Sequence, residues 1–260
     1  MVARGSARAK ELDVAREAAL KASQLLLTKY GRARVHYKAD RSIVTAADMG
    51  AERAIRAIIG RHFRDDAYLG EEMGSREGSS GRTWIVDPLD GSTNYSIGNP
   101  FFATSIALVE GDEPVLGVVN YPPQRELFIA TKGTGAYLNG KRIVVSDSQN
   151  LRLATLTFCH SPDPASIGRI SRIFRRLKEV TSRTRQMGAA SLELCFTACG
   201  RVDAFLMVGV NSWDVAAGIL MVEEAGGQVT DLSGGKFTLS STSLLASNGR
   251  IHKGLLKLLA

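Results

Sequence analysis

Acidic residues gather in one short segment, Trp84–Asn94, which has the sequence WIVDPLDGSTN. Its three apolar residues predict a strand, and Asp87 follows them directly. We expect Pro88 to end the strand, because proline has no amide hydrogen for a sheet hydrogen bond, and the resulting turn to bring Asp90 beside Asp87. Two carboxylates, with the Leu89 carbonyl between them, are hard oxygen ligands of the kind that Mg²⁺ prefers.

The residues after this turn favour an anion. Gly91 permits a close backbone approach, and Ser92-Thr93-Asn94 resemble a helix start, where free amides bind phosphate oxygens. The segment therefore indicates a combined metal and phosphate site. The alternative is a plain turn in which the aspartates cap backbone amides.

Three further acids lie where elements begin or end. Glu71 follows a short predicted strand, Asp214 follows Trp213 at a predicted helix start, and Asp48 lies near the start of another helix. Each has a structural explanation when taken alone, as a helix cap or a surface charge. Taken with Asp87 and Asp90, they favour the metal site.

Hydrophobic periodicity defines the elements that must position these residues. It predicts helices at 7–29, 45–63, 164–178, 190–199, 213–225 and 251–259. Strands are predicted at 67–69, 83–86, 104–109, 115–120, 127–131, 136–145, 154–159, 183–186, 204–208, 228–230 and 244–246. The hairpin spacing before residue 148 and the strand–helix alternation after it predict an α+β sub-domain at 1–148 and an α/β sub-domain at 149–260.

The composition is that of an ordinary globular protein, with 260 residues of which 44% are hydrophobic. The longest early apolar run, Leu25–Leu27, is too short for a signal peptide, and no stretch approaches the roughly 18–20 apolar residues of a membrane span. The number of cysteines is odd, and they are Cys159, Cys195 and Cys199. This favours buried thiols in a reducing compartment. We therefore expect a cytoplasmic protein without membrane contact.

The net charge of +7 comes largely from two basic stretches, residues 4–34 and 169–185. Both are typical of solvated helix faces. A basic field also attracts phosphorylated metabolites or nucleic acid, so nucleic acid stays open as a partner.

Together, Gly70–Glu72, Trp84–Asn94 and Trp213–Gly218 resemble the motifs of the inositol monophosphatase family, among the lithium-sensitive, Mg²⁺-dependent phosphatases. Lys38–Asp48 and Glu224–Gly227 match as well. The resemblance implies a layered αβαβα sandwich, a homodimer, and a phosphomonoesterase that acts on a small phosphorylated metabolite.

The resemblance also implies a ligand set for two to three Mg²⁺ ions. Glu71, Asp87 and the Leu89 carbonyl would hold the first ion, and Asp87, Asp90 and Asp214 the second. Glu71 would assist a third ion through water.

Catalytic roles follow from the same resemblance. Ser92 would place its hydroxyl on the nucleophilic water, with Asp48 and Lys38 to orient it and Glu71 to assist. The amides of Gly91 and Ser92, at the helix start that includes Thr93, would hold the phosphate.

The substrate pocket departs from the family pattern at Met207, where inositol-preferring members usually carry an acid that binds substrate hydroxyls. Gly188 and Ala190 match a substrate-lining loop, and Arg185 just before it would bind a second phosphate or form a structural pair. Inositol 1-phosphate is the first expectation for the substrate. Fructose 1,6-bisphosphate (alone or as a dual activity), 3′-phosphoadenosine 5′-phosphate and histidinol phosphate stay open, as does a role in binding RNA or the transcription machinery through the basic helix at 164–178.

Overall fold

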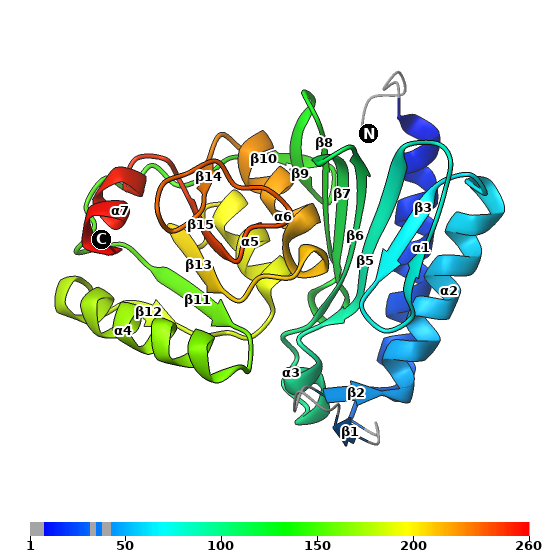
Figure 1. Ribbon diagram of the computed structural model, residues 1–260, viewed down its shortest axis with the longest axis horizontal. Helices are drawn as coiled ribbons and strands as arrows, with labels where there is room; N and C mark the ends of the chain where they lie inside the picture. The colour runs from blue at the N-terminus through cyan, green and yellow to red at the C-terminus, as the bar shows by residue number, and fades with distance from the viewer. Residues whose placement is uncertain (1–7, 32–34, 38–42, 260) are drawn as a thin grey trace.

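Helices and sheets alternate in layers in the computed structural model, which describes residues 8–31, 35–37 and 43–259 (Figure 1). One outer layer contains α1 (Ala9–Lys29) and α2 (Ala46–His62), and the other contains α4 (Pro164–Val180) and α7 (His252–Leu259). Two further helices, α5 (Ala190–Ala198) and α6 (Ser212–Glu224), lie between the two large sheets. This arrangement confirms the predicted αβαβα sandwich.

The larger sheet has eight strands in the order β10-β9-β8-β7-β6-β5-β3-β4. Their bounds are β3 (Ala67–Gly70), β4 (Gly74–Arg76), β5 (Arg82–Asp90), β6 (Ala103–Glu110), β7 (Glu113–Tyr121), β8 (Glu126–Thr131), β9 (Gly135–Leu138) and β10 (Lys141–Ile143). Within this sheet β3 and β5 run parallel, so their C-terminal ends reach the same edge. In open α/β sheets, ligands bind outside the C-terminal ends of parallel strands, so this end of the β3–β5 pair is a candidate position for a site.

The smaller sheet has five strands in the order β12-β11-β13-β15-β14. They are β11 (Leu156–His160), β12 (Thr184–Arg185), β13 (Ala204–Val208), β14 (Gln228–Thr230) and β15 (Ser243–Ser247). Both α5 and α6 are apolar on almost every face, as expected for helices buried between two sheets. One hydrophobic cluster runs from β6 and β7 through α5 and α6 to β13, so the two predicted sub-domains share a core. Their division at residue 148 stays a prediction.

A third sheet is small and was not predicted. It pairs β1 (Val35–Tyr37) with β2 (Ile43–Thr45), which leads directly into α2. The short helix α3 (Ser92–Ser96) contacts β2. This contact brings the start of α2 close to the segment that follows β5. Lys38 lies outside the described residues.

The prediction that Pro88 ends its strand is wrong. β5 continues to Asp90, and its pairing with β6 shifts between Asp87, opposite Ser105, and Asp90, opposite Ala103. The strand therefore carries a bulge at the proline, which is where a sheet tolerates a residue without an amide hydrogen.

The single strand predicted at 136–145 is also wrong. The chain forms a hairpin of β9 and β10, because Asn139 and Gly140 both adopt positive φ angles and make the turn between the strands. β4 and the 3₁₀ helix Pro122–Gln124 were not predicted either. None of the described helices has the length and apolar character needed to cross a membrane.

Candidate active site

The bulge in β5 places the two aspartates of the opening segment. The side chains of Asp87 and Asp90 are buried, with exposed fractions of 2% and 7%. Asp87 Oδ1 accepts a hydrogen bond from the Leu89 amide at 3.0 Å, and Thr104 Oγ1 donates to the Pro88 carbonyl at 3.0 Å. These bonds fix the irregular backbone, so both carboxylates stay at the sheet edge although the chain does not turn there.

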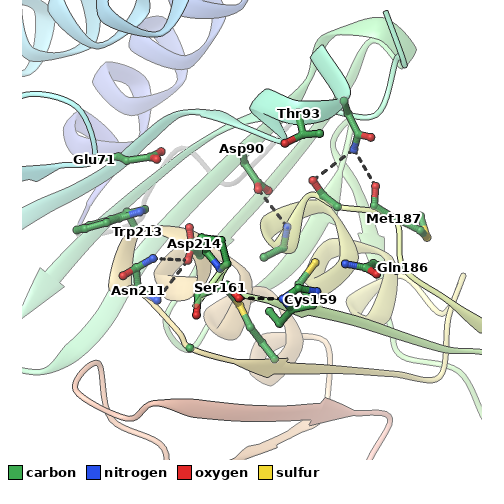
Figure 2. Close-up of a pocket in the computed structure, with 17 residues that line it drawn as sticks. Glu71, Asp90, Thr93, Cys159, Ser161, Gln186, Met187, Asn211, Trp213 and Asp214 are labelled. Carbon is green, nitrogen blue, oxygen red and sulfur yellow. Dashed lines mark hydrogen bonds between the residues drawn. The ribbon is translucent and has the colours of Figure 1, made fainter. Parts of the chain in front are cut away.

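Asp90 connects the larger sheet to helix α5. Its carboxylate accepts a hydrogen bond from the amide of Ala190 at 3.1 Å (Figure 2). It also accepts from the Ser191 amide, at 2.7 Å, and from the Ser191 hydroxyl. These amides belong to the first two residues of α5. Asp90 therefore caps the N-terminus of this helix from β5 of the larger sheet. Burial raises the pKa of Asp90 to about 6, although the hydrogen bonds from Ser191 and Ala190 act in the opposite direction.

Glu71 reaches the same edge from the neighbouring strand. It follows β3, and its amide donates to the Val86 carbonyl at 3.2 Å. Burial raises the pKa of Asp87 well above its usual range, and the charges of Glu71, Asp90 and Asp214 and a hydrogen bond with Glu71 raise it further. The acids are therefore close enough to repel one another.

Asp214 belongs to the N-terminus of α6. Its carboxylate accepts hydrogen bonds from the Asn211 amide at 3.2 Å, which is one half of a capping box, and from the Asn211 side chain at 3.1 Å (Figure 2). Burial raises the pKa of Asp214 to about 8, with added contributions from the charges of Asp90 and Glu71. Asp214 therefore has the helix-capping role that was expected as an alternative. The capping hydrogen bonds do not neutralise the charge of its carboxylate.

Ser92 and Asp48 meet beside these acids. The Ser92 hydroxyl lies 3.1 Å from Asp48 Oδ1 and 2.9 Å from the Leu89 carbonyl oxygen. Asp48 is 1% exposed and belongs to the first turn of α2. Both acceptors compete for one hydroxyl hydrogen, which leaves the lone pairs of Ser92 Oγ available to accept a hydrogen bond.

A cavity of about 760 Å³ opens beside this group, and Glu71, Asp90 and Asp214 line it (Figure 2). Of the predicted substrate residues, Thr93, Gly188, Ala190 and Met207 also line it. The rest of the wall includes Asn94, Cys159, His160, Ser161, Pro162, Gln186, Met187, Gly209, Asn211 and Trp213. Its size suits a small metabolite.

Three predicted substrate residues are not part of this wall. Arg185 is exposed, and its guanidinium donates to the Thr184 carbonyl at 2.9 Å. Gly91 has a φ of 90°, and a side chain there would meet the Phe101 carbonyl oxygen at 2.8 Å, so glycine is required where the backbone packs closely. Ser92 faces Asp48 beside the cavity.

Sequence reasoning missed two residues that hold the wall in place. Asn94 Nδ2 donates to the carbonyls of Phe101, at 2.9 Å, and Met187, at 2.7 Å, and so ties α3 to the loop before α5. From the other side, Glu193 accepts from the Gly188 amide at 3.0 Å and from the Cys159 thiol at 2.9 Å. The sequence signal for Glu193 was a lone acid in an apolar helix, which needs a partner when it is buried.

The donor set fits a hard divalent cation, because it consists of carboxylates and one main-chain carbonyl whose mutual repulsion a cation would relieve. Among the described residues, no three His, Cys, Asp or Glu side chains form a ready-made cluster of metal ligands. The reason is that the Asp90 carboxylate points to α5 and the Asp214 carboxylate to Asn211. Glu71, Asp90 and Asp214 therefore line one cavity, while the carboxylates of Asp90 and Asp214 are bonded to partners within the protein.

The layered fold and the acid-lined cavity define a phosphatase class. The chain belongs to the inositol monophosphatase family, whose family model matches residues 8–260. It is 36% identical over 252 residues to a fructose-1,6-bisphosphatase/inositol-1-monophosphatase of Aquifex aeolicus, covering 95% of this chain and 94% of that protein. It is 38% identical over 253 residues to the Nus factor SuhB of Pasteurella multocida, with 94% of each chain covered.

A solved structure agrees with the fold. The extragenic suppressor protein suhB from Bartonella henselae superposes with a TM-score of 0.92 at 36% identity, covering 96% of this chain and 98% of that one. The family and the enzyme class predicted from the motifs are therefore confirmed.

Proposed function

We propose that this chain is a Mg²⁺-dependent phosphomonoesterase for a small phosphorylated polyol or sugar, with inositol 1-phosphate as the first expected substrate and fructose 1,6-bisphosphate as the second. The observation that carries the proposal is that Glu71, Asp90 and Asp214 line one cavity and that the buried Asp87 is close enough to all three for their charges to raise its pKa. A pocket with this charge would repel a phosphate unless cations were present.

Glu71, Asp87, Asp90, Asp214 and the Leu89 carbonyl would hold two to three Mg²⁺ ions. When bound, the ions would lower the pKa of water and stabilise charge on the departing alkoxide. These residues come from three elements: the end of β3, β5 and the start of α6. Hydrogen bonds within the protein would keep them in position.

Ser92 would orient the attacking water. Its hydroxyl hydrogen points to Asp48 or to the Leu89 carbonyl, so Oγ would accept a hydrogen from the water and fix its direction. Buried Asp48 would keep this hydroxyl in place. The Gly91 and Ser92 amides stay our prediction for the phosphate oxygens.

The cavity wall that faces the rest of the substrate is mixed. Met207 contributes a thioether, which accepts only weak hydrogen bonds, whereas Thr93, Ser161 and Gln186 supply stronger polar groups. Because position 207 is not an acid, these neutral groups would bind the hydroxyls of a polyol substrate. Assembly as a homodimer and inhibition by lithium are further properties that the family resemblance implies.

The test is phosphate release in Mg²⁺ from inositol 1-phosphate, fructose 1,6-bisphosphate, 3′-phosphoadenosine 5′-phosphate and histidinol phosphate, with Asp90→Asn as the blank. We expect inositol 1-phosphate to give the highest kcat/KM. Equal rates for the wild-type protein and the blank on all four would refute the proposal, and a different best substrate would refute the inositol preference alone.

The contribution of position 207 is measured with Met207→Glu against Met207→Leu. An added carboxylate would accept hydrogen bonds from substrate hydroxyls, so Met207→Glu should lower KM for inositol 1-phosphate relative to fructose 1,6-bisphosphate. Leucine has a similar volume and should change neither KM by more than about twofold. Equal effects of both substitutions would show that Met207 does not face the substrate.

A further inference from the structure

A second cavity, of about 240 Å³, lies on the outer helical layer and is lined mainly by arginine. Arg169, Arg172, Arg175 and Arg176 of α4 line it together with Ile173, Leu232 and Leu259. It shares no residue with the acid-lined cavity. In Figure 1, α4 and α7 lie together at one end of the molecule, on the far side of the smaller sheet from α5 and α6.

These arginines have little to neutralise them within the part of the chain that the structure describes. Arg169, Arg172 and Arg175 form no ion pair there, whereas Arg8, Arg82 and Arg201 all do. Arg176 donates to the carbonyls of Leu258 and Leu259, at 3.3 and 3.0 Å, which fixes its guanidinium at the end of α7.

Two acids lie near the cavity in sequence, and neither forms an ion pair with a described residue. Asp231, next to the wall residue Leu232, turns its carboxylate to the amides of Ser233, at 2.7 Å, and Gly235, at 2.9 Å. Glu179 is exposed on the last turn of α4 and forms no ion pair with a described residue.

Like charges that face one small volume repel one another, each pair by roughly 1 kcal/mol at 4 Å even in water. The spacing along α4 puts residues 169, 172 and 176 on one helix face, next to the buried face that contains Ile170, Ile173 and Leu177. Four arginines of one helix therefore line the same hollow, and a bound anion would relieve their mutual repulsion. Guanidinium groups bind phosphate oxygens in pairs of parallel hydrogen bonds, so several of them suit adjacent phosphate groups.

We propose that this cavity is a second anion site, which binds a compact polyphosphate, meaning two or three linked phosphate groups on a small molecule. The size of the cavity favours such a ligand over an extended polymer. Beyond Arg175, the flank of α4 carries Ile167 and Phe174, which are 43% and 38% exposed, together with Lys178, whose ammonium donates to the Ser182 carbonyl at 3.1 Å.

The experiment is isothermal titration of the full-length protein with sodium tripolyphosphate, in EDTA and at low and moderate salt. EDTA removes divalent ions, so the acid-lined cavity repels the probe. We expect one site per chain, with a Kd that rises at least tenfold in Arg172→Gln/Arg175→Gln. The double variant Arg53→Gln/Arg61→Gln is the matched control, because it removes the same charge from exposed positions on α2 and should change the Kd by less than about twofold.

Three results would overturn the proposal: no binding by the wild-type protein, equal losses in both double variants, or binding of a single-stranded RNA oligonucleotide without binding of tripolyphosphate. The last would assign α4 to the nucleic-acid contact that the basic sequence left open. Circular dichroism shows whether each variant is folded. The proposal does not depend on the phosphatase activity, because the titration needs no turnover and the two cavities share no residue.

Discussion

Strand β5 has a single buried acid near its start and a cluster of buried acids at its other end, and the two sites are built differently. Near its start, Asp66 accepts hydrogen bonds from Ser80 Oγ at 2.8 Å, Arg82 Nε at 3.0 Å and Trp84 Nε1 at 2.9 Å. Arg82 also pairs with the other Asp66 oxygen at 2.9 Å. The charge of this carboxylate is therefore neutralised by the protein itself.

At the other end of the strand, no described lysine or arginine forms an ion pair with Asp87, Asp90 or Asp214. Their partners are amides, hydroxyls and one another, and burial together with mutual repulsion raises the pKa values of Asp87 and Asp214. A buried acid with an internal cation contributes to the stability of the fold. The buried acids beside the cavity lack such a cation, which supports the proposed binding of a cation from solution.

The largest effect should come from removing one charge at the cavity end. Asp90→Asn should lower kcat/KM for inositol 1-phosphate in Mg²⁺ by on the order of 100- to 1,000-fold, because it removes a charged ligand at the reacting centre. Ser191→Ala removes only the hydroxyl that bonds Asp90, and should cost less than tenfold. Equal losses in both variants would mean that Asp90 acts only as the cap of α5.

The next effect concerns stability at the other end. Asp66→Asn should lower the free energy of unfolding by about 3 kcal/mol, since breaking a buried ion pair leaves Arg82 without its main partner. Urea denaturation measures this change. At a temperature where the variant is folded, its kcat should match the wild-type value, and a large loss of kcat would contradict the division of roles between the two ends.

Magnesium should stabilise the cavity end. If Mg²⁺ is added at about 100 times its Kd, the free energy of unfolding should rise by about 2.7 kcal/mol, which corresponds to a Tm increase of roughly 5–10 °C. Differential scanning calorimetry should show this increase for the wild-type protein and for Asp112→Asn, an exposed acid in the turn after β6, at the opposite end of that strand from Ala103, which pairs with Asp90. The increase should be much smaller for Asp214→Asn. Identical increases in all three proteins would place the ion elsewhere.

A smaller, pH-dependent effect comes from a third kind of buried ionisable group. His252 is 1% exposed, and its ring nitrogens face the hydroxyls of Ser247 at 2.8 Å and Thr230 at 2.9 Å. Burial lowers the pKa of His252 to about 4, so the folded protein keeps the ring neutral while the unfolded chain binds a proton near pH 6.5.

The contribution of His252 to stability is therefore complete above pH 6.5 and falls as the pH drops from about 6.5 towards 4. The slope from this residue is at most about 1.4 kcal/mol per pH unit. Urea titrations at pH 7, 6 and 5 should show a steeper decrease for the wild-type protein than for His252→Gln. Parallel decreases would assign the acid sensitivity to other groups.

Much of the fold followed from local pattern. The strand at 204–208 and the helices near 164–178 and 213–225 were placed within about two residues, because apolar periodicity reports which face of an element is buried. Pro88 was misjudged, since only the register between β5 and β6 reveals that a bulge accepts it. The two-stranded sheet was missed because three-residue strands carry almost no periodic signal.

For the site, the sequence by itself determined the chemistry: which acids, which hydroxyl and which glycine turn the chain could offer, and in which family they recur. The tertiary structure alone decided their arrangement. The parallel pairing of β3 with β5 brings Glu71 to Asp87, and the packing of α5 against the sheet edge gives Asp90 its amides. The tertiary structure also places Arg185 outside the acid-lined cavity. Four arginines of α4 line the second cavity. Spacing along a chain fixes neighbours on one element, whereas contacts between elements distant in sequence depend on how the layers pack.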